Sequence, residues 1–380
     1  MGIATVIMAL LGAPLFVIIA ANTLLQLFFG DSQLSDFYAK FYLLAKNSNL
    51  LPIPLFTFAG YLLAESGAPR RLLNFTRATL GWMPGGLAIV CIGACAFFTA
   101  FTGASGVTII ALGGLLFPAL IHERYKEKFS LGLVTTAGSL GLLFPPSLPL
   151  ILYAVIASQS VKNPEMAPSI DALFRAGILP GLLMVLLLSI YSAIIALRDE
   201  IPRPAFSFKP FLNALWDIRY ELPLPFLVLG AIYSGKIAIS EAAALTAFIV
   251  LIVELLLYRE IKWKDLPDIM RRSMVLVGSI MIIMGCSLSY TDNLIRDQVP
   301  HHILNFIKSF ITSKLGFLLA LNIFLLIVGC MLDIFSALVV VVPLIVPLAL
   351  HYEIDLVHLG IVFLANLNIG YMTPPVGLNL

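Results

Sequence analysis

Two apolar stretches of the chain are each broken by a pair of prolines: residues 138–150 read GSLGLLFPPSLPL, and residues 366–378 read NLNIGYMTPPVGL. A proline pair removes two backbone donors and disfavours helix for the residue before it, so carbonyl groups lose their helical partners. In hydrocarbon, such backbone is tolerated only where it is buried in protein or lines a cavity. Either break alone would be compatible with an ordinary proline kink, but two matching breaks predict a functional feature.

The composition places the chain in a lipid bilayer. Of the 380 residues, 60% are hydrophobic and only 12% are charged, and the mean hydropathy is +1.01. About 25% of the residues of a soluble domain are charged, so too little polar surface is available here to cover a globule in water. The net charge of +2 gives no field that would recruit nucleic acid.

The sequence lacks the motifs of enzymatic chemistry. Its four cysteines lie in apolar runs without metal-ligand spacing. The phosphate-cradling pattern GxxxxGK followed by Ser or Thr does not occur, and neither do GxSxG and HExxH. We therefore expect no ATP site and no enzyme.

Apolar segments long enough to cross a bilayer recur along the chain. A crossing helix needs about 20 apolar residues, and residues 2–30 carry no charge, which predicts an uncleaved first span. Further spans are predicted at residues 48–64, 130–158, 176–197, 221–235, 238–258, 273–290 and 358–380.

Four loops hold most of the basic residues and indicate the orientation of the spans. Fifteen of the 23 lysines and arginines lie in loops 65–77, 122–128, 198–219 and 259–272. The positive-inside rule places these loops in the cytoplasm, and the three tryptophans lie in or near them, as in an interfacial belt.

The apolar stretch 87–121 is predicted to be a re-entrant hairpin. Basic loops flank it on both sides, so it enters and leaves the bilayer by the same face. Its middle, Thr102-Gly103-Ala104-Ser105-Gly106, is a polar, helix-breaking tip. Each arm of about 15 residues would reach roughly 23 Å, short of the roughly 30 Å hydrocarbon core. Two short full spans are the alternative.

The stretch 316–350 behaves in the same way from the opposite side. Two apolar arms, 316–331 and 337–350, surround the tip Leu332-Asp333-Ile334-Phe335-Ser336. Asp333 is the one carboxylate at a predicted mid-membrane tip, where an ionisable group is costly and functional by default. Cation binding, proton coupling and capping of the returning arm are compatible explanations.

The two hairpins belong to an internal repeat with one offset of 229 residues and no gap. This shift relates five pairs of identical residues: Pro118 and Pro347, His122 and His351, Gly141 and Gly370, Pro145 and Pro374, and Pro146 and Pro375. The two units have opposite predicted orientation, which indicates an inverted-topology repeat, as in many secondary transporters. We predict an all-α membrane protein with a first repeat at 1–200, a cytoplasmic linker at 201–220 and a second repeat at 221–380.

Each hairpin is followed by a broken helix, at 130–158 and at 358–380. Tips and breaks expose helix N-termini, which favour anions, and free carbonyls, which favour cations. Carbonyl and hydroxyl oxygens together suit Na⁺. The hydroxyls at these points belong to Thr102, Ser105, Ser139, Ser147, Ser336 and Thr373.

Two amphipathic segments, 69–80 (PRRLLNFTRATL) and 301–314 (HHILNFIKSFITSK), precede the hairpins. They are predicted to lie along the membrane surface. One functional interpretation is that they are hinge arms for the hairpin units.

The chain resembles the large membrane (M) subunit of the tripartite ATP-independent periplasmic (TRAP) transporters, of the DctM type. Matching segments cover essentially the whole chain: LLPIPLFTFAGYLLAESGAPRRLLNF (50–75), FFTAFTGASGVTIIALGGLLFPAL (97–120), GSLGLLFPPSLPLILYAV (138–155), SEAAALTAF (240–248), MLDIFSALVVVVPLIVPLAL (331–350) and LNIGYMTPPVGLNL (367–380).

This resemblance implies the fold of the ion-transporter superfamily, with an elevator-like transport domain in a bacterial inner membrane. It also implies Na⁺-driven import of an organic acid, such as a C4-dicarboxylate, a keto acid or a sialic-acid-like compound. The partners that it implies are a small membrane (Q) subunit and a periplasmic substrate-binding (P) protein.

The ion and substrate region that the resemblance implies covers both halves, with Na⁺ held by carbonyl and hydroxyl oxygens. Its residues in the first half are Thr102, Gly103, Ser105, Gly138, Ser139, Pro145, Pro146 and Ser147. Its residues in the second half are Asp333, Ser336, Asn366, Gly370, Thr373, Pro374 and Pro375. The chain departs from the family pattern at the first tip, where Ala104 and Thr108 replace a Ser and an Asp that many members carry.

The family also continues beyond the position of Leu380, so we expect a fragment or a truncated product that ends before a final helix. Three alternatives to a TRAP subunit stay open. One is a standalone Na⁺-coupled carboxylate carrier of the same superfamily, and another is a passive channel. The third is an intramembrane enzyme, which would need more intramembrane chemistry than Asp333 alone offers.

Overall fold

The computed structural model describes residues 8, 11–13, 15–29, 34–161, 163–202, 206–374 and 376–379. All regular secondary structure in these ranges is helical, which confirms the predicted all-α class. The helices of the first half are α2 (Leu15–Phe29), α3 (Leu34–Lys46), η1 (Ser48–Leu50), α4 (Pro52–Glu65), α5 (Ala68–Leu80), α6 (Gly86–Thr102), α7 (Ser105–His122), α8 (Glu127–Ala137), η2 (Leu140–Leu143), α9 (Leu148–Ser160), η3 (Pro164–Met166) and α10 (Ile170–Arg198). Those of the second half are α11 (Phe208–Asp217), α12 (Leu224–Tyr233), α13 (Ile239–Ile252), the π-helical segment η4 (Val253–Leu257), α14 (Leu266–Arg296), α15 (Val299–Lys308), α16 (Lys314–Met331), α17 (Ile334–His351) and α18 (Leu356–Gly370).

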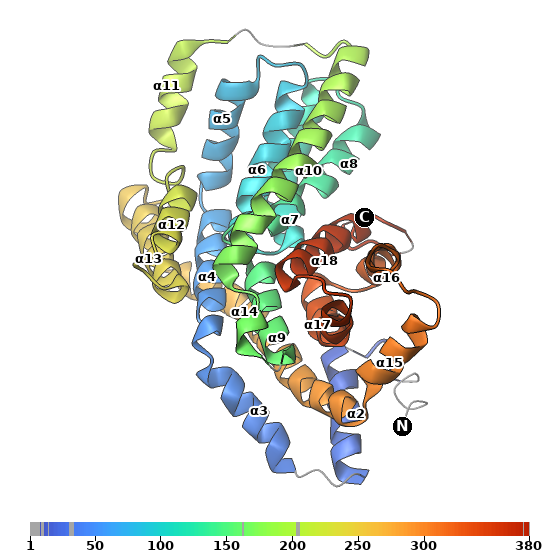
Figure 1. Ribbon diagram of the computed structural model, residues 1–380. Helices are drawn as coiled ribbons and strands as arrows, with labels where there is room; N and C mark the ends of the chain where they lie inside the picture. Colours follow the sequence, from blue (N-terminus) through green and yellow to red (C-terminus); the bar gives the residue numbers. More distant parts are fainter. Residues whose placement is uncertain are drawn as a thin grey trace.

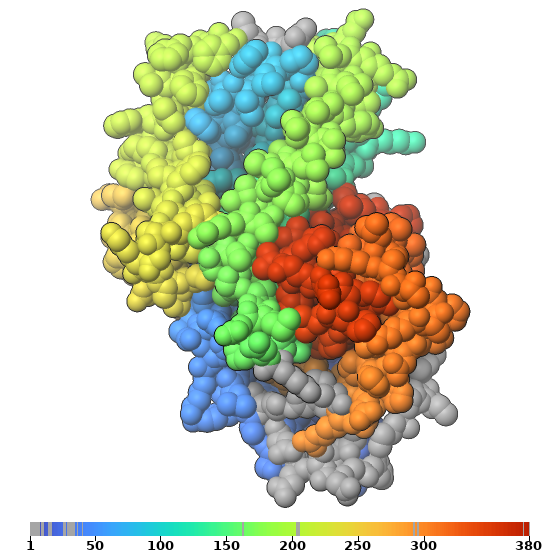
Figure 2. All heavy atoms as spheres, viewed as in Figure 1, coloured from blue at the N-terminus to red at the C-terminus, as the bar shows by residue number. Residues whose placement is uncertain are grey.

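Helix α10 runs along the surface and separates two groups of helices (Figure 1). On the face shown in Figure 2, α12 and α13 lie on one side of α10, and α16 and α18 lie on the other. Helix α4 packs on α13 and α14, whereas α16 packs on α18 and α17 packs on α9. The second hairpin and the two broken helices thus form one packed region beside α10.

Several helices in the described ranges are long and apolar enough to cross a membrane. Six segments meet this criterion, and up to eight do if each of two bent helix pairs is one span. The six are Ser105–His122, Pro164–Arg198, Ile239–Leu257, Leu266–Thr291, Lys314–Met331 and Ile334–His351. Leucines such as Leu179, Leu183 and Leu187 on α10 are exposed, as expected of a helix face that contacts lipid.

The first hairpin consists of α6 and α7, which reverse direction over two residues. Gly103 takes a left-handed conformation (φ 65°), and its N–H bonds to the carbonyl of Thr99, which ends α6. Such a conformation costs glycine little. The arms are 17 and 18 residues long, longer than the prediction of about 15, because the turn uses only Gly103 and Ala104.

The second hairpin consists of α16 and α17, and it turns at Leu332 and Asp333. The offset of 229 residues relates the bounds of these helices to those of the first hairpin. Helix α7 begins at Ser105 and ends at His122, and α17 begins at Ile334 and ends at His351. The repeat is therefore visible in the helix bounds as well as in the sequence, while the predicted domain limits at 200 and 220 stay predictions.

Both predicted breaks occur. In the first, α8 and η2 are bent by 47° relative to α9, with Phe144, Pro145, Pro146 and Ser147 between them. In the second, α18 ends at Gly370, and the described residues that follow contain no helix.

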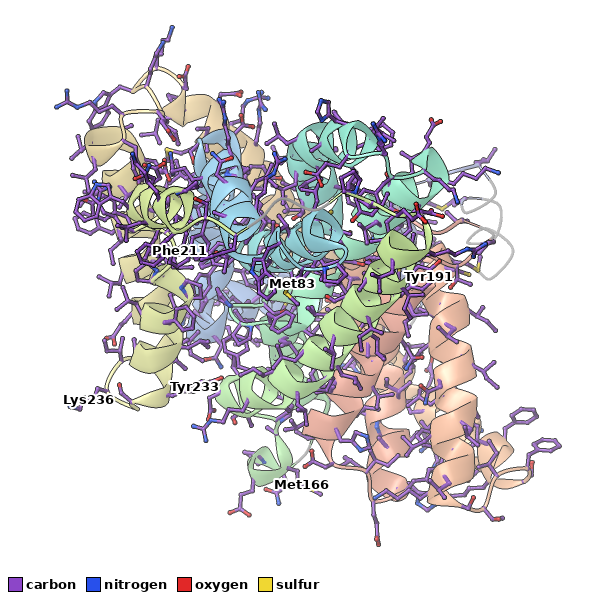
Figure 3. All side chains as sticks on the ribbon, turned by 90° about the horizontal axis from the view of Figure 1, so that it is seen from above. Met83, Met166, Tyr191, Phe211, Tyr233 and Lys236 are labelled. Atoms are coloured by element: carbon purple, nitrogen blue, oxygen red, sulfur yellow. The ribbon has the colours of Figure 1, made fainter. Side chains whose placement is uncertain are left out.

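Three helical features differ from the predicted spans. Helix α3 follows α2 where the sequence predicted only a connection, and α11 lies inside the predicted linker 201–220. Helix α12 has 10 residues, fewer than the span predicted at 221–235. Figure 3 shows Tyr233 at its end and Lys236 in the turn that follows. A simple search for long apolar runs misses α3 and α11, because both mix polar and apolar residues.

We predict that alanine at Gly141 destabilises the fold. A Cβ on Gly141 would lie 2.5 Å from the backbone nitrogen of Ala100, and backbone cannot move aside as a side chain can. Overpacking of this kind costs about 1–3 kcal/mol, so the thermal unfolding midpoint of the purified protein should fall. Gly114→Ala is the control, because its Cβ would meet open space. Equal midpoints for the two variants would contradict the close approach of the break to α6.

Candidate functional site

Three threonine hydroxyls meet at the tip of the first hairpin. Thr99 and Thr102 lie at the end of α6, Thr108 lies on α7, and all three are fully buried. The Oγ1 atom of Thr108 is 2.9 Å from that of Thr99 and 3.1 Å from that of Thr102. The sequence analysis identified Thr102 and missed Thr99, whose spacing of three residues from Thr102 places both on one helix face.

Two backbone carbonyls complete this hydroxyl cluster of Thr99, Thr102 and Thr108. The hydroxyl of Thr99 is 2.7 Å from the carbonyl oxygen of Gly138, just after α8. The hydroxyls of Thr102 and Thr108 are 3.4 Å and 3.5 Å from the carbonyl oxygen of Ala104. The tip and the start of the first break therefore share one group of five neutral oxygens, in which no carboxylate takes part.

Ser105 connects the first tip to the second break. Its hydroxyl donates to Oδ1 of Asn379 at 2.9 Å, and Nδ2 of Asn379 donates to the carbonyl of Thr135 on α8 at 3.3 Å. The backbone N–H of Asn379 in turn donates to the carbonyl of Tyr371 at 3.2 Å. The two halves of the repeat are thus bonded to each other at a predicted site residue.

Inside the first break, the predicted hydroxyls bind local backbone. Ser147 donates to the carbonyl of Leu142 at 2.5 Å and accepts the N–H of Leu150 at 3.3 Å, so it caps α9. Ser139 donates to the carbonyl of Thr136 at 3.1 Å. These two hydroxyls lie outside the hydroxyl cluster, and their role in ion binding stays a prediction.

At the second tip, Asp333 caps the returning arm. Its Oδ2 atom accepts the N–H groups of Phe335 and Ser336, each at 3.0 Å. The N–H of Ile334 donates to the hydroxyl of Tyr371, and this bond joins the tip to the second break. The capping explanation is confirmed, whereas cation binding or proton coupling by Asp333 stays a prediction.

The remaining predicted residues of the second half have packing partners. Nδ2 of Asn366 donates to Oδ1 of Asn322 on α16 at 2.7 Å, and Gly370 allows α18 to approach Gly329 of α16. Thr373 donates to the carbonyl of Ile369 at 3.0 Å. Ser336 is buried and Pro374 is exposed. Pro375 lies outside the described residues.

A cavity of about 250 Å³, lined by both apolar and polar side chains, lies between α3, α9, α14 and α17. Gln159, Ser160, Ser287 and Thr291 supply its polar lining. Ser287 donates to the carbonyl of Val339 at 2.9 Å, a carbonyl that lacks its helical partner because Pro343 has no N–H. This cavity was not predicted from the sequence, because one of its walls is helix α3, which was not expected.

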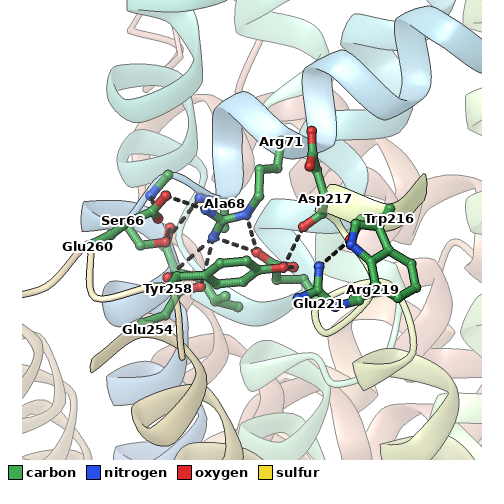
Figure 4. Close-up of polar contacts among 12 residues, drawn as sticks. Ser66, Ala68, Arg71, Trp216, Asp217, Arg219, Glu221, Glu254, Tyr258 and Glu260 are labelled. Carbon is green, nitrogen blue, oxygen red and sulfur yellow. Dashed lines mark hydrogen bonds and ion pairs between the residues drawn. The ribbon is translucent and has the colours of Figure 1, made fainter. Parts of the chain in front are cut away.

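A charged cluster lies at the start of α5 (Figure 4). Arg71 donates from Nε to Glu221 and from Nη1 to Glu260, each at 2.5 Å, and from Nη2 to Glu254 at 3.2 Å. Glu254 is fully buried, and the ring of Tyr258 lies 3.9 Å from the guanidinium carbon. This Arg71 cluster ties the predicted hinge arm to the turn before α12 and to the segment after α13.

The comparison with protein families gives a clear result. The family model described as "Tripartite ATP-independent periplasmic transporter, DctM component" matches residues 2–380. The chain belongs to this family. Membership in the DctM family, together with its apolar helices, makes it a multi-pass protein of the inner membrane.

Several relatives of known name share about a third of their residues with the chain. It is 34% identical to the isethionate TRAP transporter permease protein DctMQ of Oleidesulfovibrio alaskensis, over 87% of this chain and 51% of that protein, so it spans about half of that relative's length. It is 33% identical to the C4-dicarboxylate TRAP transporter large permease protein DctM of Pseudomonas aeruginosa, over 95% of this chain and 82% of the relative. These are names of permeases and not of enzymes.

A solved structure has a similar fold. The YdaH transporter of Alcanivorax borkumensis, described as having an unusual topology, matches with a TM-score of 0.64 over 90% of this chain and 77% of that one. At 13% sequence identity this likeness concerns the fold alone. It agrees with the predicted class of helical membrane transporter.

We predict that Arg71→Ala strongly destabilises the protein. Removal of the guanidinium leaves the buried carboxylates of Glu221 and Glu254 unpaired, and breaking a buried pair in this way costs about 3–5 kcal/mol. The exposed Arg77 pairs with Glu123 at 2.7 Å, and Arg77→Ala should cost less than about 1 kcal/mol. Thermal unfolding of both variants in one detergent measures the difference. Similar midpoints would show that the Arg71 cluster adds little.

Proposed function

We propose that this chain is the large permease subunit of a Na⁺-coupled TRAP transporter that imports an organic acid. The observation that carries the proposal is the pair of hairpin tips, each bonded to the break of its own half, with Ser105 of the first tip bonded also to Asn379 of the second break. Breaks at membrane depth provide carbonyls for a cation and helix N-termini for an anion, the two ligands of such a symporter.

The hydroxyl cluster is the best candidate for the Na⁺ site. Its five oxygens are neutral, buried and 2.7 to 3.5 Å from their neighbours. A monovalent cation could take the place of the hydrogen bonds among these oxygens, with each hydroxyl keeping its proton and offering a lone pair to the cation. Carbonyl and hydroxyl ligands carry no full charge, so the empty site would not leave a carboxylate stranded in the membrane.

The proposed substrate class rests on the relatives. Their names mention isethionate, C4-dicarboxylates and sialic acid, which are small organic anions, and ectoine in another case. A C4-dicarboxylate is the first compound to test, because the relative named for it matches 95% of this chain. A small membrane subunit and a periplasmic binding protein complete the proposed assembly, in keeping with the tripartite family.

The transport cycle that we propose is of the elevator type. The hairpins and broken helices would move together against α4, α13 and α14. Helix α5 would then be the arm that connects the two parts, held at its start by the Arg71 cluster.

Reconstitution tests the proposed function. Proteoliposomes that contain the chain and its small subunit, with the binding protein added, should accumulate labelled succinate only when Na⁺ is higher outside than inside. Uptake that ignores the Na⁺ gradient would contradict coupling and support a channel. Uptake at the same rate without the binding protein would support a standalone carrier instead.

We predict that Thr108→Val raises the half-saturating Na⁺ concentration for uptake about tenfold, which corresponds to about 1.4 kcal/mol. The substitution keeps the shape and removes one oxygen from the hydroxyl cluster. Thr246→Val is the matched control, because Thr246 is equally buried but bonds only to the carbonyl of Ala242 in its own helix, at 2.7 Å. A wild-type Na⁺ curve for Thr108→Val would exclude the hydroxyl cluster as the ion site.

A further inference from the structure

The carboxamide of Asn368 is buried without any hydrogen-bond partner. Its exposed fraction is 0%, and neither Oδ1 nor Nδ2 has a partner within the described part of the chain. A buried polar group without a partner costs about 1–3 kcal/mol by mutational measures. Two such atoms on one side chain are therefore an anomaly that calls for a ligand.

Asn368 differs from the other buried polar groups that lack partners. Ser192, Ser289, Tyr233 and Asn293 each have a single atom of this kind, whereas Asn368 has both ends of its amide unpaired. Asn366, two residues earlier on the same helix, bonds to Asn322 and to the carbonyl of Val362 at 2.7 Å and 2.8 Å. The amide of Asn366 is therefore hydrogen-bonded within the protein, whereas the amide of Asn368 on the same helix is not.

Asn368 lies two residues before the end of α18, the helix that packs on the first break and leads into the second. It is about 200° around α18 from Asn366, at roughly 100° per residue, so it points away from α16. The other elements that pack on α18 are α9, α10, α17 and η2. Segment η2 belongs to the first break, and α18 ends at Gly370, where the second break begins.

The chemistry of an amide limits what could bind there. The oxygen accepts hydrogen bonds or ligates a cation, and the NH₂ group only donates. A cation alone would satisfy Oδ1 and leave Nδ2 unpaired, while a carboxylate alone would do the reverse. Both atoms are satisfied when a cation and a carboxylate bind side by side.

We propose that Asn368 is where the substrate meets a second coupling cation, distinct from the one proposed at the hydroxyl cluster, with Oδ1 as a ligand of this cation and Nδ2 as a donor to the carboxylate of the substrate. This inference rests on the proposed function and deepens it by naming a residue that contacts both ligands. Because the side chain is enclosed by packed helices, the substrate reaches it only when the helices that pack on α18 separate. The binding of one ligand then favours the other through the shared amide.

The first test uses Asn368→Leu in the purified full chain. Leucine has a similar volume and removes the unpaired amide, so in choline chloride the variant should unfold at the wild-type temperature or above it. In sodium chloride the wild type should gain stability, and the variant should keep only part of that gain, because the hydroxyl cluster is left intact. Asn322→Leu is the control: it removes the amide that bonds to Asn366 at 2.7 Å, so it should unfold at a lower temperature in both salts, and it should keep the Na⁺-induced gain.

The second test separates the two ends of the amide. Asn368→Asp keeps an oxygen that can ligate Na⁺ and lacks the donor, so the Na⁺-induced gain in stability should persist. Uptake of succinate should require at least tenfold more substrate, and the same holds for pyruvate or N-acetylneuraminate if the wild type takes up one of those instead. If Asn368→Leu does not fold, the substrate dependence of uptake by Asn368→Asp still tests the contact with the carboxylate.

Other outcomes would overturn the proposal. An Asn368→Leu variant with the full Na⁺-induced gain and normal uptake would show that the amide binds neither ligand and holds at most a water molecule. An Asn368→Asp variant with wild-type substrate dependence would exclude the contact with the carboxylate. A wild-type protein that shows neither Na⁺-induced stability nor Na⁺-driven uptake would instead contradict the proposed function itself.

Discussion

Backbone groups that leave a helix in apolar surroundings must find partners inside the protein, and this requirement governs both breaks. The carbonyl of Gly138 accepts from Thr99 on the first hairpin, and the carbonyl of Leu142 accepts from Ser147. In the second half, the N–H of Ile334 at the hairpin tip donates to the hydroxyl of Tyr371 in the break. Because a tip and a break supply each other's partners, neither can be positioned without the other, and the polar groups at the centre of the molecule form connected clusters.

The sequence predicts the local part of this arrangement well. Glycine and proline act on their own backbone, so the tips and breaks occur where the patterns indicate, and the bounds of α7 and α17 follow the offset of the repeat. The contact of Ser105 with Asn379 was not predictable, because it depends on the path of the chain after the second proline pair. Thr99 was missed because a threonine in an apolar run resembles any small helical residue.

Charged contacts occupy a different place in the structure from the neutral clusters. The Arg71 cluster joins α5 to two segments more than 140 residues away in the sequence, with partners at 2.5 Å. Its guanidinium is enclosed by three carboxylates and by the ring of Tyr258. A fork-shaped, bidentate group is needed for this geometry, so lysine would not replace Arg71. The start of α5 is consequently held by ion pairs, while the first tip is held by neutral hydrogen bonds.

The two hairpins share helix bounds but differ in how their arms are packed. Helices α6 and α7 pack on each other and share the hydroxyl cluster, whereas α16 packs mainly on α18, and α17 packs on α9 and α14. A displacement of one arm of the first hairpin is therefore passed directly to the other arm through their shared contacts. In the second hairpin the two arms have few contacts with each other. A displacement of α16 is therefore passed first to α18 and the break that follows it, and only then to α17.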